Sequence, residues 1–425
     1  MNLKKYIDDN KQEIFSLGKE LFETPELGYK EFKTKEILIK YFIKHNLEVE
    51  QEYFETGFSL SIGKGKPHIG LIAELDAIPT LGHRCANKSN NNAAHSCGHS
   101  TQCAILAATL VSLSKEKLNK GKVTLFFTPA EEYTDLDYKD KLIKAKKIKY
   151  YGGKINMLTS GLFDDVDMLL HLHMKSESDY RYSVGGRLGG FVYKKITFNG
   201  KAAHAAVAPN KGINALNIYT LFNDGLNMLR ETFVEEDKIR VHGIVVDGGQ
   251  TVNSIPEKVI YECYVRSVND KALLDISNKI DNLAKCTSKA LGGSCVIKTK
   301  PGYLPFIQDQ NVNEAVYKAM LNYCDESKIK KGSISIAASD LGDVSTFIPS
   351  IEFGYGGLKG VAHSKDVEVV DEERVYIETS KLMIDIINEL LNNNELYKKI
   401  KKEFKPRMSK DEYLKYLDSW KKRVS

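Results

Sequence analysis

The apolar run His68-Ile69-Gly70-Leu71-Ile72-Ala73 is the stretch of this sequence that decides its fold. Nearly continuous apolar runs are typical of strands that are buried on both faces of a sheet. Two similar runs follow at 123–127 and 166–170, and the Ala-rich segment 101–113 between them predicts a buried helix. A helical apolar pattern at 3–46 precedes the first run. Alternating strands and helices predict an α/β domain.

A second pattern begins after the glycine-rich segment Gly185–Gly190, which we expect to be a hinge-like loop. Strand and helix signals then follow in the order β-α-β-β-α-β and end at Pro301-Gly302. This order is typical of a small ferredoxin-like domain. We therefore predict a discontinuous domain at 1–186 and 302–425, with an inserted α+β domain at 187–301.

Composition and charge exclude several classes of function. The 425 residues are 42% hydrophobic, which is enough for more than one core. The formal net charge is only +5, from 61 basic and 56 acidic residues that are interspersed, so we expect no nucleic-acid partner. We see no apolar run of membrane-spanning length and no signal peptide, and the seven cysteines lack a disulfide framework. These features predict a cytoplasmic protein with no membrane partner.

Two polar clusters lie beside the predicted strands and helix. His95-Ser96-Cys97-Gly98-His99 comes directly before the Ala-rich helix, and a thiolate and an imidazole at this spacing can bind one metal site. Pro129-Ala130-Glu131-Glu132 follows the strand at 123–127, where adjacent carboxylates can divide metal binding and proton transfer. Each pattern by itself also has a structural explanation. A lone Cys-Gly-His is often structural, and adjacent acidic residues stabilise the N-terminus of a helix.

Further polar residues follow the other strands. In His171-Leu172-His173 the two imidazoles point to the same side of a strand, so either or both can reach a cleft. Asp76 lies two residues after Glu74, at the end of a strand, and can orient a ligating imidazole. Ligands of α/β sheets bind at the carboxyl ends of strands. The joint occurrence of these residues at successive strand ends therefore predicts a metal site.

Together these motifs resemble those of the dinuclear metallo-amidohydrolases, the family of aminoacylases, glutamate carboxypeptidases and p-aminobenzoyl-glutamate hydrolase. The resemblance covers nearly the whole chain, from Phe22–Gly28 through Gly200–Ala206 and Asn253–Pro256 to His363. The Cys-Gly-His form is that of the amidohydrolase branch, and Ser339–Ser345 looks closest to the p-aminobenzoyl-glutamate hydrolase-like group. The resemblance implies a zinc-peptidase-like catalytic domain with a central mixed sheet flanked by helices. It also implies that the inserted ferredoxin-like domain is a lid that joins a homodimer.

The same resemblance implies two divalent metal ions per chain, with zinc or manganese preferred and cobalt or nickel as alternatives. Glu131 would be the catalytic base, Asp76 would orient a ligand, and His204 of the inserted domain would stabilise the oxyanion. Arg266 and Asn253 are candidate substrate-binding residues, and a structural ion pair explains Arg266 equally well. The implied metal ligands are Cys97, His99, Glu132, His173 and His363.

The sequence also departs from the family. Ser100-Thr101-Gln102 stands where the family often has an acidic or amide residue and then another histidine, and the insert 82–92 is longer and more polar than in aminoacylases. We expect hydrolysis of the amide bond of an N-acyl amino acid, an aminobenzoyl-glutamate-like or a dipeptide-like substrate. One alternative is a non-catalytic metal- or ligand-binding relative, which would not need Glu131. The other is a thiol enzyme that uses Cys97 as its nucleophile.

Overall fold

The computed structural model describes residues 3–175 and 179–421, which belong to two compact units. Unit 1 is built from the segments Met1–Arg187, Ile307–Ile334 and Asp343–Arg407. Unit 2 is built from Leu188–Phe306, Ser335–Gly342 and Met408–Ser425. Three of these boundaries fall within the short strands β9 (Arg187–Leu188), β14 (Phe306–Ile307) and β16 (Ile334–Ser335).

Unit 1 contains an eight-stranded mixed sheet in the order β1-β2-β6-β3-β7-β17-β8-β15. Its four central strands β6, β3, β7 and β17 are parallel, so their carboxyl ends lie at one edge. Every residue of β3 is buried, which confirms the strand predicted from the apolar run. The strands are β1 (Gln51–Tyr53), β2 (Gly57–Lys64), β3 (His68–Glu74), β6 (Gly121–Thr128), β7 (Met168–Met174), β8 (Tyr182–Val184), β15 (Ile329–Lys331) and β17 (Ser350–Tyr355).

Helix α4 (His99–Ser114) packs on β3, β6 and β7 and confirms the predicted buried helix. All its residues up to Leu113 are buried, because α1, α2 and α11 cover its other side. This packing fixes the N-terminus of α4 within unit 1. The other main helices of unit 1 are α1 (Leu3–Asp9), α2 (Lys11–Phe22), α3 (Phe32–Lys44), α5 (Leu136–Lys144), α6 (Gly153–Thr159), α9 (Gln310–Met320), α11 (Thr379–Asn392) and α12 (Asn394–Glu403).

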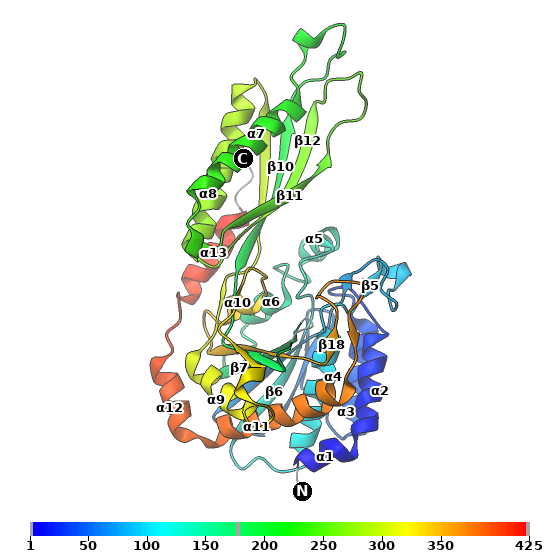
Figure 1. The fold of residues 1–425 in the computed structure, drawn as a ribbon, viewed down its shortest axis with the longest axis vertical. Coiled ribbons are helices and arrows are strands. Elements are labelled where there is room, and N and C mark those ends of the chain that lie inside the picture. Colours follow the sequence, from blue (N-terminus) through cyan, green and yellow to red (C-terminus); the bar gives the residue numbers. More distant parts are fainter. Residues whose placement is uncertain (1–2, 176–178, 422–425) are drawn as a thin grey trace. The chain divides into compact units, whose positions relative to one another are not determined.

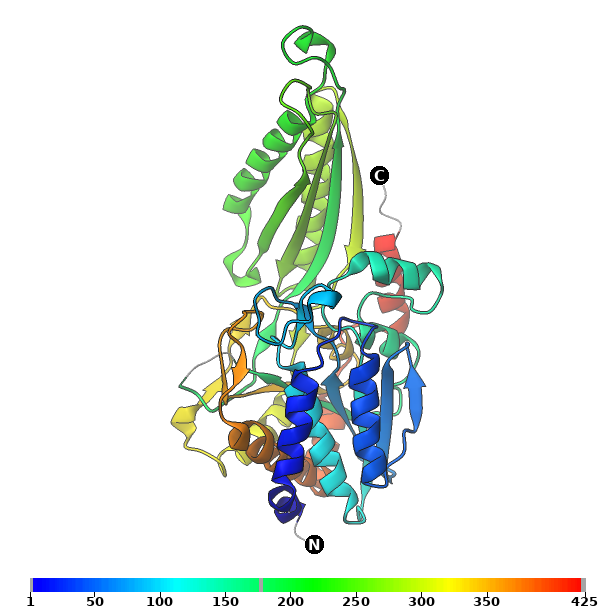
Figure 2. The ribbon, with the colours of Figure 1, turned by 90° about the vertical axis from the view of Figure 1, so that its right-hand side faces the viewer.

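Unit 2 contains a four-stranded antiparallel sheet in the order β11-β12-β10-β13. Helices α7 and α8 pack against one face of it (Figures 1 and 2). The chain order β-α-β-β-α-β and this strand order confirm the predicted ferredoxin-like fold. The elements are β10 (Gly190–Asn199), α7 (Ala215–Leu229), β11 (Arg240–Asp247), β12 (Lys258–Ser267), α8 (Asp270–Ala290) and β13 (Ser294–Pro301).

The units divide the chain differently from the predicted ranges in three segments. Residues 302–306, 335–342 and 408–421 were expected in the first domain, but they group with unit 2, and Arg187 groups with unit 1. Helix α13 (Lys410–Lys421) packs against β13, and its Trp420 is buried in the core of unit 2. The glycine-rich segment Gly185–Gly190, expected to be a loop, includes the short strand β9.

All seven cysteines are free thiols, in line with the absence of a disulfide framework in the sequence. Among the described residues, the structure has no helix with both the length and the apolar character needed to cross a membrane.

Candidate metal centre and active site

The structure brings together the five side chains predicted to bind metal. Their ligand atoms form two groups of three, and within each group all atoms lie within 4.8 Å of one another. Cys97, His99 and His173 make the first group, and Cys97, Glu132 and His363 make the second. The residues come from the start of α4, the loop after β6, strand β7 and the loop after β18 (Leu358–Lys359). Segments far apart in the sequence therefore converge on one sulfur atom.

Backbone geometry places the two ligands at the start of α4. Gly98 between them has φ 82°, and a Cβ there would lie 2.6 Å from Met174 Cγ, so glycine is required. The backbone N–H of His363 donates to the carbonyl of Ser96 at 2.8 Å. His363 itself has φ 69°. The loop that carries it is thus tied to the Cys-Gly-His turn.

Cys97 is the charged centre of the cluster. Its Sγ lies 3.4 Å from His173 Nε2 and 3.2 Å from His363 Nε2. Burial and Glu132 raise the pKa of the thiol, but His173 and His99 outweigh them and bring the pKa to about 6. The sulfur is therefore largely a thiolate at neutral pH, the form that binds metals.

The polar atoms of this cluster fit a divalent metal. His99 Nδ1 contacts the carbonyl oxygen of Asp76 at 2.8 Å, which leaves Nε2 as its ligand nitrogen. Within the described residues, His99 Nε2 and Glu132 Oε1 are buried without a hydrogen-bond partner, although Glu74 Oε2 lies 3.0 Å from the former and His363 Nε2 3.2 Å from the latter. Buried polar atoms without partners are costly unless a ligand satisfies them. A thiolate, imidazoles and a carboxylate are donors that suit borderline divalent ions.

Asp76 contacts both sides of the site. It was predicted to orient a ligating imidazole, and its Oδ1 lies 3.3 Å from His99 Nδ1. The shorter contact to that nitrogen comes from its backbone carbonyl. The other carboxylate oxygen accepts the N–H of Glu132 at 2.9 Å. Asp76 therefore links the Cys-Gly-His turn to the turn that carries Glu131 and Glu132.

Glu131 is buried and lies beside the cluster. One of its carboxylate oxygens, with Glu74 and His99, forms a third group of potential ligand atoms within 4.8 Å. Of the two adjacent carboxylates, Glu132 is therefore grouped with Cys97 and His363, while Glu131 is grouped with His99. The two side chains project to different parts of the cluster.

The two histidines of β7 have different surroundings. His173 faces Cys97, whereas His171 lies between two carboxylates and joins neither of the two groups around Cys97. His171 Nδ1 lies 3.0 Å from Glu352 Oε2, and its Nε2 lies 3.3 Å from Glu74 Oε2. From the sequence, both histidines were candidate ligands because they point to the same side of the strand. In the structure, His173 belongs to the cluster around Cys97, and His171 belongs to a buried ionic network.

Glu74 also belongs to this site, although no role was predicted for it. Its Oε1 is paired at 2.6 Å with Nζ of Lys154, and both side chains are fully buried. Its other oxygen is 3.0 Å from His99 Nε2. The spacing of two residues from Asp76 at the end of β3 was the available signal, because it puts both carboxylates near the same edge of the sheet.

His204 and Asn253 lie on adjoining loops of unit 2. His204 forms an isolated β-bridge with Ser254, and the carbonyl of Asn253 accepts the N–H of Ala205 at 2.9 Å. Both predicted residues are exposed. The pairing of the loops brings these two candidates close together within unit 2.

Arg266 lies on β12 and is partly buried. Its guanidinium donates to the carbonyl of Ile336 at 3.1 Å and lies over the rings of Phe191 and Tyr264 at 5.3 and 5.2 Å. Burial lowers its pKa. These contacts are with a carbonyl and two aromatic rings, so they differ from the ion pair considered as its structural explanation.

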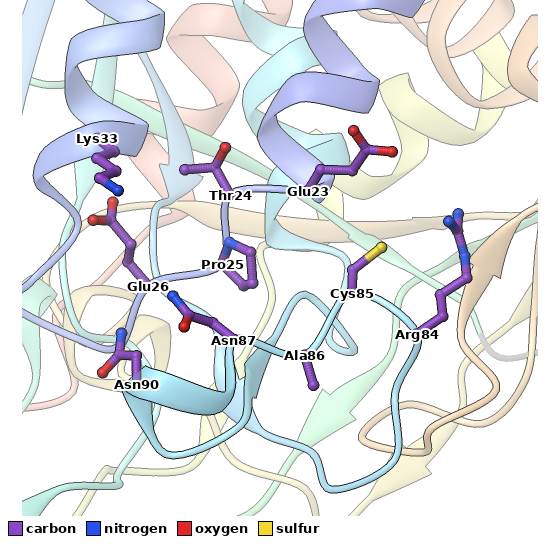
Figure 3. A pocket seen from close by; sticks show the side chains of 10 residues that line it. All are labelled: Glu23, Thr24, Pro25, Glu26, Lys33, Arg84, Cys85, Ala86, Asn87 and Asn90. Atoms are coloured by element: carbon purple, nitrogen blue, oxygen red, sulfur yellow. The ribbon is translucent and has the colours of Figure 1, made fainter.

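The insert 82–92 lines a cavity of about 410 Å³ together with the segment that links α2 and α3. Figure 3 shows that Glu23 and Glu26 come from that segment, Lys33 from the first turn of α3, and Arg84 and Cys85 from the insert. The five predicted metal ligands are not among the residues that line this cavity. The insert therefore helps to line a pocket that contains none of the predicted metal ligands.

The sequence as a whole matches a known protein family. The model of the family described as "Peptidase family M20/M25/M40" matches residues 70–389 of this chain. The chain belongs to this family. Its relatives include an Xaa-Arg dipeptidase of Homo sapiens, 24% identical over 97% of this chain and 93% of that protein. An N-acetyl-L-cysteine deacetylase of Bacillus subtilis (strain 168) is 25% identical, with 90% and 89% covered.

Two further similarities concern the predicted branch and the fold. One component of the p-aminobenzoyl-glutamate hydrolase of Escherichia coli (strain K12) is 26% identical over 75% of this chain and 65% of that protein. A solved dinuclear metal-binding M20 peptidase of Bacillus subtilis is 19% identical, with a TM-score of 0.67, and covers 89% of this chain and 98% of its own. The predicted family and fold class are confirmed. This M20 protein is a metal-dependent amidohydrolase, so the non-catalytic alternative is not supported.

Proposed function

We propose that this M20 protein hydrolyses the amide bond of an N-acyl amino acid, an aminobenzoyl-glutamate-like or a dipeptide-like substrate, with two divalent ions per chain. The observation that carries the proposal is that two groups of three ligand atoms share Cys97 Sγ beside Glu131. Two groups with a common atom support two neighbouring ions. We propose zinc or manganese, because the thiolate and imidazoles suit zinc and the carboxylates suit manganese, and cobalt or nickel is compatible with this set.

The proposed mechanism assigns a task to each residue of the chain. Bound divalent ions would supply Lewis acidity that lowers the pKa of water and polarises the amide carbonyl. Glu131 would take the proton from the water and deliver it to the leaving amine. Asp76 would orient His99 through its contacts at Nδ1. Cys97 would serve as a ligand and not as a nucleophile, because its sulfur belongs to both groups.

Unit 2 would supply contacts to the substrate. We assign His204 to stabilise the oxyanion that forms on the amide carbonyl. Arg266 and Asn253 would bind the polar end of the substrate, where a guanidinium fork matches a carboxylate. The names of the three relatives support the substrate class, since a dipeptide, N-acetyl-L-cysteine and p-aminobenzoyl-glutamate each contain an amide bond to an amino acid.

We also propose that unit 2 joins two copies of the chain. Strand β11 is an edge strand of its sheet, and Ile244, Val245 and Val246 on it are exposed. An exposed apolar edge strand favours pairing with a second copy. The seven free thiols support a reducing compartment, the cytoplasm, as its location.

The proposed function is tested with Glu131→Gln and Glu132→Gln and a panel of N-acyl amino acids and dipeptides. Glu131→Gln should retain metal and fold but lower kcat by roughly two to four orders of magnitude, because only the proton acceptor is lost. Glu132→Gln should lose metal. The reverse behaviour would exchange the two roles, and a metal-loaded wild-type protein without hydrolase activity on the panel would refute the substrate class.

A further inference from the structure

The turn that carries Glu131 has an unusual backbone. Ala130, directly before it, has φ 54° and is fully buried. A residue with a Cβ rarely adopts this left-handed conformation, which persists only where surrounding contacts enforce it. The turn 129–132 therefore needs contacts that hold it.

Three fully buried ionisable side chains hold the backbone of this turn. Glu31 Oε1 accepts the N–H of Ala130 at 2.9 Å, and Asp76 Oδ2 accepts the N–H of Glu132 at 2.9 Å. Nζ of Lys139 donates to the carbonyl of Glu132 at 2.6 Å. Buried ionisable groups destabilise a protein unless they are hydrogen-bonded, so their presence at one turn calls for an explanation.

Glu31 and Lys139 are themselves fixed by unit 1. Glu31 directly precedes α3, and its second oxygen is hydrogen-bonded to the hydroxyl of Thr56 at 2.5 Å. Lys139 is on α5, with its ammonium 5.7 Å from the centre of the Tyr29 ring. Separate parts of unit 1 thus meet at a turn of four residues.

The turn is also confined by two glycines. A Cβ on Gly28 would lie 2.7 Å from Ala130 Cβ, and a Cβ on Gly153 would lie 1.8 Å from the carbonyl oxygen of Pro129. The turn therefore cannot shift toward either glycine without contacting backbone. The polar contacts and the close packing restrict it from several sides.

We propose that Glu31 and Lys139 are positioning residues that hold the Ala130–Glu132 turn, so that Glu131 can act as the base and Glu132 as a ligand. The proposal rests on the proposed function of these two carboxylates. Glu31 and Lys139 act through the backbone of the turn, and catalysis depends on placement because a misplacement of about 1 Å can lower the rate about 100-fold.

The protonation state of Glu31 suggests a sharp test. Burial, and then the charge of Asp76, raises the pKa of Glu31 to about 8. At neutral pH the side chain is therefore mostly a neutral acid, which glutamine resembles in size and in hydrogen bonding. Glu31→Gln should preserve the contact to Ala130, whereas Glu31→Ala should remove it.

The variants Glu31→Gln, Glu31→Ala and Lys139→Met are compared in the full chain for kcat, KM, metal content and thermal unfolding. We expect Glu31→Ala and Lys139→Met to lower kcat about 10- to 100-fold with little change in KM, and Glu31→Gln to keep kcat within about threefold of wild type. If Glu31→Ala does not fold, Thr56→Val, which removes only the contact to the second oxygen, should lower kcat by a smaller factor.

Lys194→Met is the matched control. Lys194 is fully buried in unit 2, where it contacts Asp281 Oδ1 at 2.5 Å and Thr299 Oγ1 at 3.1 Å. The control should lower the unfolding temperature and leave kcat close to wild type. Wild-type kcat in folded Glu31→Ala and Lys139→Met, or equal losses in Glu31→Gln and Glu31→Ala, would overturn the proposal.

Amide hydrogen exchange separates this proposal from the proposed function. Peptides that cover 128–134 should exchange faster in Glu31→Ala and Lys139→Met than in wild type, and at the wild-type rate in Glu31→Gln and Lys194→Met. This result does not require a substrate, so it stands even if the wild-type protein hydrolyses none of the panel. Unchanged exchange in both Glu31→Ala and Lys139→Met would overturn the positioning role.

Discussion

At the scale of single residues, Cys97 has the most demanding position, because its sulfur is the atom that both ligand groups share. We predict that Cys97→Ala loses at least one of two bound ions, measured by elemental analysis after reconstitution. Cys263→Ala is the control, since Cys263 is equally buried but lies on β12 of unit 2, where burial raises its pKa to about 12. Unchanged metal content in both Cys97→Ala and His99→Ala would sink the assignment.

Glu31 gives a prediction for pH. In the folded chain its pKa is raised to about 8, from an ordinary value of 4.5. Between these values the unfolded chain releases a proton that the folded chain keeps, so this group's contribution to the free energy of unfolding falls as the pH rises. This contribution is fully present below pH 4.5, the pKa in the unfolded chain, and it is lost as the pH rises through about 8, the pKa in the folded chain. The slope is at most about 1.4 kcal/mol per pH unit.

Glu31→Gln removes this titration. Urea unfolding at about pH 5 and about pH 8 should therefore show the variant gaining stability relative to wild type as the pH rises. The exposed Glu395→Gln is the control and should show no such trend. A constant difference between Glu31→Gln and wild type at both pH values would contradict the raised pKa.

Residues that bind through their side chains were easier to predict than residues that bind the backbone. Cys97, His99 and the pair Glu131-Glu132 stand in short motifs at the ends of predicted elements. Glu31 and Ala130 are 99 positions apart, and their contact uses a backbone N–H that any residue type offers. No local pattern could indicate it. Lys139 was equally hidden, because it contacts a carbonyl oxygen.

At the scale of elements, strongly buried segments were predicted best. Strand β3 and helix α4 are buried on nearly all sides, so continuous apolar runs identified them. The pattern at 3–46 gave one helical region, but the structure has three helices there, interrupted at Asn10 and between residues 22 and 32. Helix α13 shows a further limit, since the basic sequence of this tail is typical of a solvated helix face and does not indicate that Trp420 packs in the core of unit 2.

The turn between β6 and α5 leads to a prediction about packing. Gly28→Ala would place a Cβ 2.7 Å from Ala130 Cβ. We expect this overpacking to lower the free energy of unfolding by about 1–3 kcal/mol, measured by urea denaturation. Gly248→Ala is the control, because its nearest neighbour, Val245 Cγ1, would be 3.6 Å away. Equal stability of the two variants would show that the turn can move away from residue 28.

At the scale of the whole molecule, the exposed edge of unit 2 predicts the oligomeric state. Ile244→Lys places a charge on the apolar edge strand β11 and should convert a dimer to a monomer in sedimentation experiments. Leu291→Lys, at the end of α8, is a control on another exposed apolar residue of unit 2 and should leave the dimer intact. A wild-type protein that sediments as a monomer would refute the proposed interface.

The proposed role of His204 connects the reaction at the metal ligands of unit 1 with a residue of unit 2. His204→Ala should lower kcat by about 100- to 1000-fold without loss of metal, because a donor to the oxyanion is removed. His242→Ala, which changes another exposed histidine of unit 2, should have a much smaller effect.

A structural role of His204 must be separated from this catalytic one. His204 Nδ1 accepts the N–H groups of Ala206 and Val207 at 3.3 and 3.1 Å, so the side chain also stabilises its own loop. Asparagine can accept the same kind of hydrogen bond but has no imidazole. If His204→Asn restores the activity that His204→Ala loses, the residue only shapes the loop. If both variants are equally impaired while metal content and unfolding temperature stay at the wild-type values, the imidazole itself acts in the reaction.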